Sequence, residues 1–237
     1  MAELIVKYLK YSFIGLCRRG ILPLTLLFSG CISNPPPNLP DTWIPRSTPL
    51  ADSDIEDGEI PKIHIFIMYG KLIPLHTALR VYSPELGAVF WDPEGGYGKK
   101  KKGPKAKRVK DVVVDPVPTV KDYLKFREVN PTQKTEVFEF HVDVEIANKL
   151  IRMLTPENDG EIIAYETDVE GPFCSSSISK FLTKHSDQTV QTPKVCLPQT
   201  FSKYLYQQNP DRVIIADDDI YIEYGPGPEA QSPNTSF

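Results

Sequence analysis

Short runs of apolar or alternating residues, bounded by Gly, Pro and Ser, dominate the middle of the chain. Such runs are typical of β-strands. They lie at 63–70 (IHIFIMYG), 76–83 (HTALRVYS), 88–93 (AVFWDP), 136–144 (EVFEFHVDV), 161–171 (EIIAYETDVEG) and 211–224 (DRVIIADDDIYIEY). The first three follow one another closely, so we expect them to pair as sequential antiparallel strands.

Helical periodicity appears in three other segments, 145–154 (EIANKLIRML), 175–185 (SSSISKFLTKH) and 199–209 (QTFSKYLYQQN). In each of them apolar residues recur three and four positions apart, which predicts a helix with one buried face. Strands combined with a few helices indicate the α+β class. The predicted fold is therefore an antiparallel sheet with helices packed on one side.

Both ends of the chain lack this periodicity. Residues 31–59 combine the proline-rich ISNPPPNLPDTWIPRSTP with the acidic ADSDIEDGE, and residues 225–237 are rich in Gly, Pro and Ser. Such compositions favour an extended chain that packs poorly. We therefore predict a folded domain over residues 60–224, preceded by a tether (31–59) and followed by a disordered tail (225–237).

Residues 1–30 have the features of a signal peptide. Arg18 and Arg19 precede the apolar run 21–28, and small residues follow it. This run is too short to span a bilayer. The stretch LLFSGC resembles the bacterial lipobox, in which the cysteine is lipidated and becomes the new N-terminus. The resemblance implies lipidation of Cys31 and attachment to a bacterial cell envelope, facing the periplasm or the outside. The alternative is an uncleaved N-terminal anchor, which also leaves the rest of the chain outside the cytoplasm.

The composition is that of an ordinary globular protein. The chain has 237 residues, 41% of them hydrophobic, and a formal net charge of -4. This charge argues against a nucleic-acid binder that works by bulk charge, because such domains carry an excess of Lys and Arg. The segment 99–110 (KKKKGPKAKRVK) is strongly basic and has no apolar face, so we interpret it as an exposed loop. Its functional alternative is contact with an anionic lipid or polymer.

The cysteines of the folded domain could form a disulfide or serve as a nucleophile. Cys17 and Cys31 belong to the leader, so the folded domain keeps Cys174 and Cys196. In an envelope compartment these two would most simply form a disulfide. However, Cys174 stands at the start of the predicted helix 175–185. The positive end of a helix dipole favours a thiolate, and the free backbone N–H groups there can bind an oxyanion.

A cysteine nucleophile also requires a base and a third group that orients the base. The chain has four histidines, His64, His76, His141 and His185. His76 opens a predicted strand, and the small Ala78 on the same face leaves room for a substrate. Asp92 ends the neighbouring predicted strand. We therefore expect Asp92, His76 and Cys174 to lie together.

The order HTALRV, FWDP and FCSSSISKFL resembles the circularly permuted branch of the NlpC-like papain-fold superfamily, in which the histidine strand precedes the cysteine helix. The resemblance covers about residues 63–185. It implies a permuted papain-like fold with Cys174 as nucleophile, His76 as general base and Asp92 as the third polar residue.

The resemblance also implies a cysteine hydrolase that acts on amide bonds. For an envelope lipoprotein the expected substrates are peptidoglycan peptides, with Tyr69, Trp91 and Tyr97 as candidate substrate-binding rings or core residues. The membrane would be contacted through the N-terminal lipid, and no specific nucleic acid is expected. No closely spaced His, Cys or Asp set occurs, so no metal or other cofactor is expected. Two alternatives stay open: a lipid acyltransferase or thioesterase on the same fold, and a binding lipoprotein with a Cys174–Cys196 disulfide.

Overall fold

The structure is a computed structural model, and it describes only part of the chain. Every described residue belongs to the compact unit Pro36–Phe237. The described ranges are 43–47, 57–70, 74–93, 95–98, 105–109, 111–128, 134–155, 174–192, 197–217 and 220–226. Residues 161–171, for which a strand is predicted, and Cys31 and Cys196 lie outside them.

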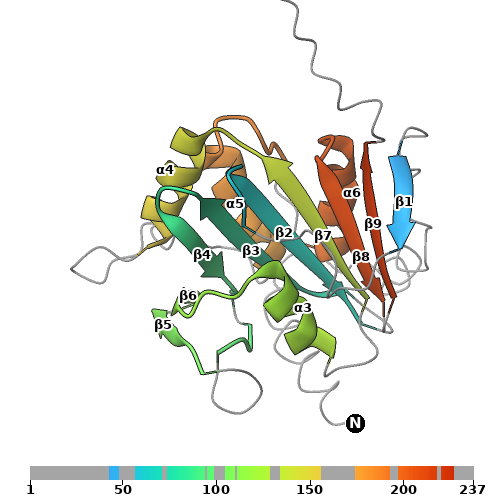
Figure 1. Ribbon diagram of the computed structural model, residues 1–237, viewed down its shortest axis with the longest axis horizontal. Coiled ribbons are helices and arrows are strands. Elements are labelled where there is room, and N and C mark those ends of the chain that lie inside the picture. Colours follow the sequence, from blue (N-terminus) through green and yellow to red (C-terminus); the bar gives the residue numbers. More distant parts are fainter. Residues whose placement is uncertain are drawn as a thin grey trace, which may run out of the picture. The chain divides into compact units, whose positions relative to one another are not determined.

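A single antiparallel sheet is the centre of the fold (Figure 1). Its strand order is β1-β9-β8-β7-β2-β3-β4-β6-β5. The strands are β1 (Trp43–Ser47), β2 (Lys62–Tyr69), β3 (Pro74–Ser83), β4 (Gly87–Trp91), β5 (Lys107–Val109), β6 (Val112–Asp115), β7 (Lys134–His141), β8 (Arg212–Asp217) and β9 (Ile220–Pro226). The predicted sequential pairing is confirmed for β2, β3 and β4. The run 211–224 forms two paired strands, β8 and β9, instead of one.

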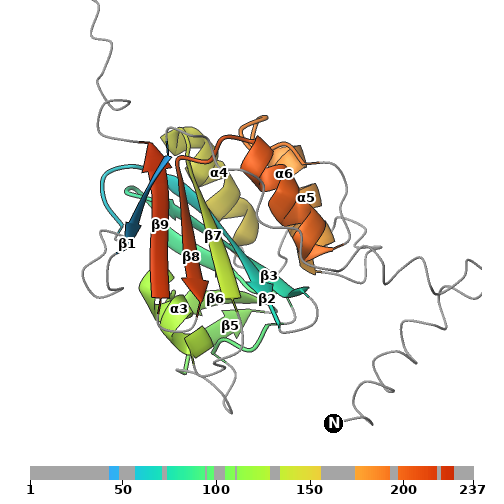
Figure 2. The same ribbon diagram turned by 90° about the vertical axis from the view of Figure 1, so that its right-hand side faces the viewer.

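Helices cover both faces of this sheet (Figures 1 and 2). The three predicted helices, α4 (Val144–Leu154), α5 (Cys174–His185) and α6 (Pro198–Gln207), pack on one face. A further helix, α3 (Val120–Glu128), packs on the opposite face. The α+β class is confirmed, but the expectation of helices on one side only is wrong. The nine-residue α3 has only a short apolar stripe, and the sequence pattern did not reveal it.

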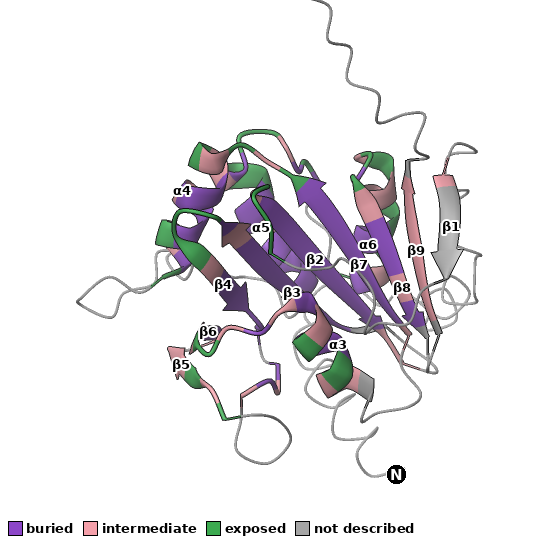
Figure 3. Cartoon of the chain, viewed as in Figure 1, coloured by how far each residue is buried: buried purple, intermediate pink, exposed green. Residues whose placement is uncertain are grey.

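Alternation along the central strands creates two cores, one on each face. On β2, Ile63, Ile65 and Ile67 face α4, α5 and α6, whereas Phe66 and Met68 face α3. This is the period of two expected for strands covered on both faces. The middle strands β2, β3 and β7 are buried along most of their described length, and β9, next to the edge strand β1, is half-buried (Figure 3). The sheet therefore offers a rigid centre on which side chains can be held.

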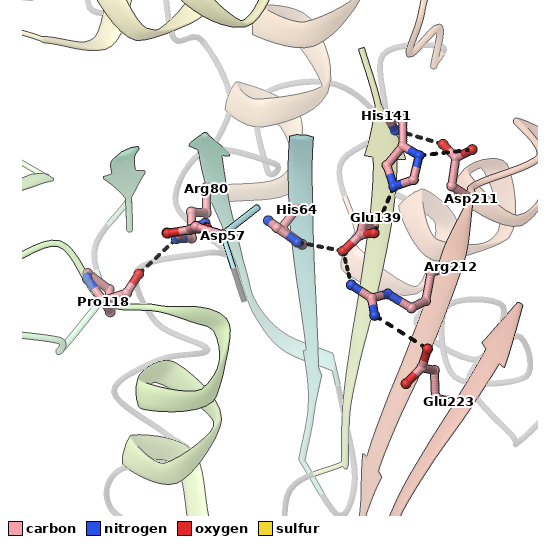
Figure 4. A network of polar contacts seen from close by, with 9 residues as sticks. All are labelled: Asp57, His64, Arg80, Pro118, Glu139, His141, Asp211, Arg212 and Glu223. Carbon is pink, nitrogen blue, oxygen red and sulfur yellow. Dashed lines mark hydrogen bonds and ion pairs between the residues drawn. The ribbon is translucent and has the colours of Figure 1, made fainter. Parts of the chain in front are cut away.

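A row of charged side chains crosses the α3 face of the sheet (Figure 4). His64 Nε2 lies 2.9 Å from Glu139 Oε2, and Arg212 also donates to Glu139. Burial raises the pKa of Glu139, but hydrogen bonds with His141 and His64 and the charges of His64 and Arg212 outweigh it and hold the pKa well below its usual range. The buried Glu139 is therefore ionised, and its partners link β7 to β2 and β8.

The sheet extends beyond the predicted domain boundaries. Residues 43–47, predicted as part of the tether, form β1, which pairs with β9. Proline is tolerated there because β1 is an edge strand, whose outward N–H groups need no partner. Asp57, also in the predicted tether, accepts two hydrogen bonds from the buried Arg80. At the other end β9 continues to Pro226, past the predicted start of the tail. Residues on both sides of the predicted boundary at residue 60 therefore contribute to the sheet and its contacts.

Candidate active site

The candidate site lies where the pairing of β3 with β4 stops. The last residue of β4, Trp91, is opposite Leu79, so His76 and Thr77 extend beyond the paired part of this ladder. The chain leaves β4 at Asp92, whose backbone N–H donates to the carbonyl of Asp111. One side of β3 is thereby left open to side chains from other elements.

Two of the predicted residues meet in this opening. His76 Nε2 lies 2.6 Å from Asp92 Oδ1. Asp92 is fully buried, and His76 is 9% exposed. Since Asp92 occupies Nε2, the ring nitrogen Nδ1 is the one left for another partner.

Cys174 is the third member, and it is the first residue of α5. Its Sγ accepts a hydrogen bond of 3.1 Å from the backbone N–H of Thr77, the residue after His76 on β3. Cys174 is also close enough to His76 to contribute to the raised pKa of the imidazole. Cys174 is half-buried and carries a free thiol. The structure therefore brings together the three predicted residues, and Cys196, the partner that the disulfide alternative requires, lies outside the described ranges.

The Asp92 carboxylate is held from several directions. Tyr123 Oη donates to Oδ1 at 3.1 Å, and the backbone N–H of Tyr97 donates to Oδ2 at 3.2 Å. Arg108 lies 3.6 Å from Oδ2 and donates to the Asp92 carbonyl at 3.2 Å. Such a shell fixes the carboxylate, and through it the orientation of the imidazole.

The charges around His76 favour its protonated form. Burial lowers the pKa of His76, but hydrogen bonds to Asp92 and Cys174 and the charges of both raise it from 6.5 to about 9. For Asp92, burial raises the pKa, whereas the hydrogen bond and charge of His76, the charge of Arg127 and the Tyr97 N–H lower it below its usual value. Near neutral pH the site therefore contains an imidazolium beside an ionised carboxylate.

A glycine beside Asp92 makes room for this carboxylate. The turn that follows β4 is closed by the backbone N–H of Gly95, which donates to the carbonyl of Asp92 at 2.9 Å. A Cβ atom on Gly95 would stand 1.9 Å from the Asp92 carboxylate. Any larger residue at this position must displace the carboxylate.

The three aromatic residues that were candidates for substrate binding lie in different environments. Trp91 and Tyr97 are 2% and 3% exposed and pack in the cores on opposite faces of the sheet. Rings that are buried this deeply act as core residues, which is the second of the two roles considered for them. Tyr69 is half-buried, and its hydroxyl donates to Glu136 at 2.7 Å. Tyr97 contributes to the site through its backbone N–H only.

Sequence reasoning missed the residues around Asp92, namely Thr77, Gly95, Arg108, Tyr123 and Arg127. Tyr123 and Arg127 are four positions apart on α3 and therefore share a face. Recognising α3 from its apolar positions would have drawn attention to the pair. Arg108 was hidden in the basic segment 99–110, which we expected to be solvated. Of its described residues 105–109, the last three form β5 (Lys107–Val109), so the expectation of a loop is wrong for them.

The described residues contain no group of three or more His, Cys, Asp or Glu side chains that could hold a metal ion. Within the same ranges, none of the helices has the length and apolarity needed to cross a bilayer. Comparison with known protein families, with curated proteins and with solved structures finds no match to this chain.

Proposed function

We propose that the protein is a cysteine hydrolase of the cell envelope that cleaves amide bonds by thiol acyl transfer. The observation that carries this proposal is the grouping of Cys174, His76 and Asp92, with the thiol at the first residue of α5. A nucleophile, a base and an orienting group within hydrogen-bond reach define this type of chemistry.

The proposed reaction begins with the Cys174 thiolate beside the His76 imidazolium. Sγ attacks the amide carbonyl, the S–C bond forms, and the carbonyl oxygen becomes an oxyanion. The positive end of the α5 dipole and the backbone N–H groups there stabilise this charge. As the C–N bond breaks, His76 gives its proton to the departing amine. Water, deprotonated by His76, then attacks the thioester, which releases the acid and restores the thiolate.

We further propose that the natural substrates are peptidoglycan peptides and that the protein is held at the membrane by lipid on Cys31. The resemblance of LLFSGC to a lipobox supports the location. The resemblance to the permuted NlpC-like branch supports the substrate class and a permuted papain-like fold.

Two other functions use the same residues differently. A lipid acyltransferase or thioesterase would form the same thioester but pass the acyl group to another acceptor or start from an ester. A binding lipoprotein with a Cys174–Cys196 disulfide would need no free thiol, and alkylation of Cys174 in the absence of a reducing agent would exclude it.

The test is digestion of purified peptidoglycan by the protein, with the products identified by mass spectrometry. We expect new free amine and carboxyl ends in the wild-type digest and none with Cys174→Ala. Release of fatty acid from phospholipid vesicles, without any peptide cleavage, would favour the lipid-directed alternative. Equal product formation by wild type and Cys174→Ala would refute the proposed nucleophile.

A further inference from the structure

Arg127 is a positively charged side chain beside the candidate site. Within the described ranges of the chain, no carboxylate forms an ion pair with it. It lies in the last turn of α3, and Nη2 donates to Tyr123 Oη at 2.7 Å. Its Nε is buried and has no hydrogen-bond partner in the residues described. A buried charged donor without a partner is costly, so such a group commonly awaits a ligand.

Its neighbours orient the guanidinium group without neutralising it. The guanidinium carbon lies 5.1 Å from the ring centroid of Tyr123 and 5.5 Å from that of Phe126. These contacts attract a cation to a ring face but supply no negative charge. Arg108, by contrast, has the carboxylates of Asp92 and Asp111 at 3.6 Å each.

Arg127 is also connected to the reacting groups. Tyr123 Oη, to which it donates, donates in turn to Asp92 Oδ1, which lies 2.6 Å from His76 Nε2. Burial lowers the pKa of Arg127, and the charges of Tyr123, Asp92 and Cys174 raise it. The guanidinium group is therefore linked by hydrogen bonds, through Tyr123 and Asp92, to the base of the candidate site.

We propose that Arg127 binds a carboxylate on the acyl group that Cys174 attacks, so that the site selects anionic substrates. A guanidinium group presents paired N–H donors that match a carboxylate, and this match is strongest where water is excluded. The inference rests on the proposed function, because it takes Cys174 as the nucleophile. It adds the substrate class: acyl donors, such as acidic peptides, that carry a free carboxylate near the cleaved bond.

The experiment compares two alkylating reagents of nearly equal size on the full chain. Iodoacetate is anionic and iodoacetamide is neutral, and both form an S–C bond with Cys174 as iodide leaves. The rate of each is followed by mass spectrometry of the peptide that contains Cys174. The variants are Arg127→Gln and, as a matched control, Lys125→Gln, which removes an exposed charge from the same helix.

We expect Arg127→Gln to lower the iodoacetate-to-iodoacetamide rate ratio about tenfold, because a nearby charge is worth about that much in a partly buried site. Lys125→Gln should leave the ratio unchanged. An equal loss of rate with both reagents would mean that Arg127 only positions Tyr123 and Asp92, and it would overturn the proposal. An unchanged ratio in Arg127→Gln would overturn it as well.

Two further readouts keep the test decisive. If Arg127→Gln fails to fold by circular dichroism, Arg127→Lys takes its place, and it should still lose part of the iodoacetate preference because lysine lacks the paired donors. An unaltered ratio in that variant would refute carboxylate binding. If neither reagent modifies wild-type Cys174 faster than the unfolded chain, the proposed nucleophile itself fails. Fast alkylation without any anion preference overturns the role of Arg127 alone.

Discussion

At the scale of single residues, the site depends on a position where a side chain is not tolerated. Replacing Gly95 by alanine would put a Cβ atom 1.9 Å from the Asp92 carboxylate, so the carboxylate must move away from His76. We expect Gly95→Ala to lower the rate of Cys174 alkylation by iodoacetamide at least about tenfold, since a misplaced third group misorients the base.

The adjacent glycine provides the control. A Cβ on Gly96 would meet only the Phe126 ring, at 3.8 Å, which is an ordinary contact. Gly96→Ala should therefore react like wild type in the same assay. Equal rates for the two alanine variants would show that the position of the Asp92 carboxylate does not matter.

The charge of His76 leads to a prediction about stability and pH. Its pKa is raised in the folded protein from 6.5 to about 9. A raised pKa stabilises the fold fully below about pH 6.5, and this contribution is lost as the pH rises through about 9. In wild type, the unfolding free energy should fall by about 3 kcal/mol across this window, since one pKa unit corresponds to about 1.4 kcal/mol. In His76→Gln most of this fall should be absent.

Urea unfolding at about half-unit steps between pH 6.5 and 9 measures this difference. His185→Gln is the matched control, because burial lowers the pKa of His185 and its titration falls below the window. The control should keep the wild-type slope. A His76→Gln variant with the full wild-type slope would contradict the raised pKa.

The candidate triad could be predicted from the sequence because each member stands at the end of an element. His76 opens a strand, Asp92 follows the next strand, and Cys174 begins a helix, so short-range pattern was enough to place them together. The surrounding shell could not be predicted in the same way. Gly95, Tyr123 and Arg127 act through contacts between segments, and nothing in local periodicity reports which turn will lie against which helix.

At the scale of elements, strand β5 connects the basic segment 99–110 to the candidate site through Arg108. Arg108 donates to the carbonyls of Tyr97, Asp92 and Asp111, so it fastens the turn after β4 to the sheet edge. We expect Arg108→Gln to lower the unfolding free energy by about 1–3 kcal/mol, since it leaves buried carbonyls without a donor. Cys174 alkylation should slow as well.

Lys105, an exposed residue of the same basic segment, is the control for this prediction. Lys105→Gln removes the same charge and should change neither the unfolding free energy nor the alkylation rate. Comparable losses in both variants would indicate that the charge of the segment matters, and not the bonds of Arg108. Thermal unfolding and alkylation kinetics of the two variants decide between these outcomes.

Elements were predictable from sequence to different degrees. Long alternating runs and helices with a wide apolar stripe, such as β2 and α4, were recognised because burial on a face imposes a clear period. The short elements α3, β5 and β6 were not, because they have too few residues to establish one. The edge strand β1 was hidden by proline, which disfavours central strands but not an edge.

At the scale of the whole molecule, the proposed location depends on one cysteine in the leader. Cys31→Ser should prevent lipidation and shift the protein from the membrane pellet to the soluble fraction, or leave the leader uncleaved. Cys17→Ser, a change of the same kind ahead of the apolar run, should leave the membrane fraction unaltered. Fractionation of cells followed by intact-mass measurement tests both variants. A fully processed Cys31→Ser protein that stays in the pellet would contradict the lipobox assignment.

The central claim is that His76 activates Cys174, and the pH dependence of Cys174 alkylation tests it most directly. Iodoacetamide modification of the native full-length chain is followed by mass spectrometry from about pH 6 to 9 in wild type and in His76→Ala. The account predicts that wild-type Cys174 reacts rapidly at about pH 6.5, where an ordinary thiol is almost wholly protonated, and that His76→Ala reacts at least about tenfold more slowly there. Wild-type and His76→Ala rates that coincide across this range, and that match the thiol of the unfolded chain, would contradict it.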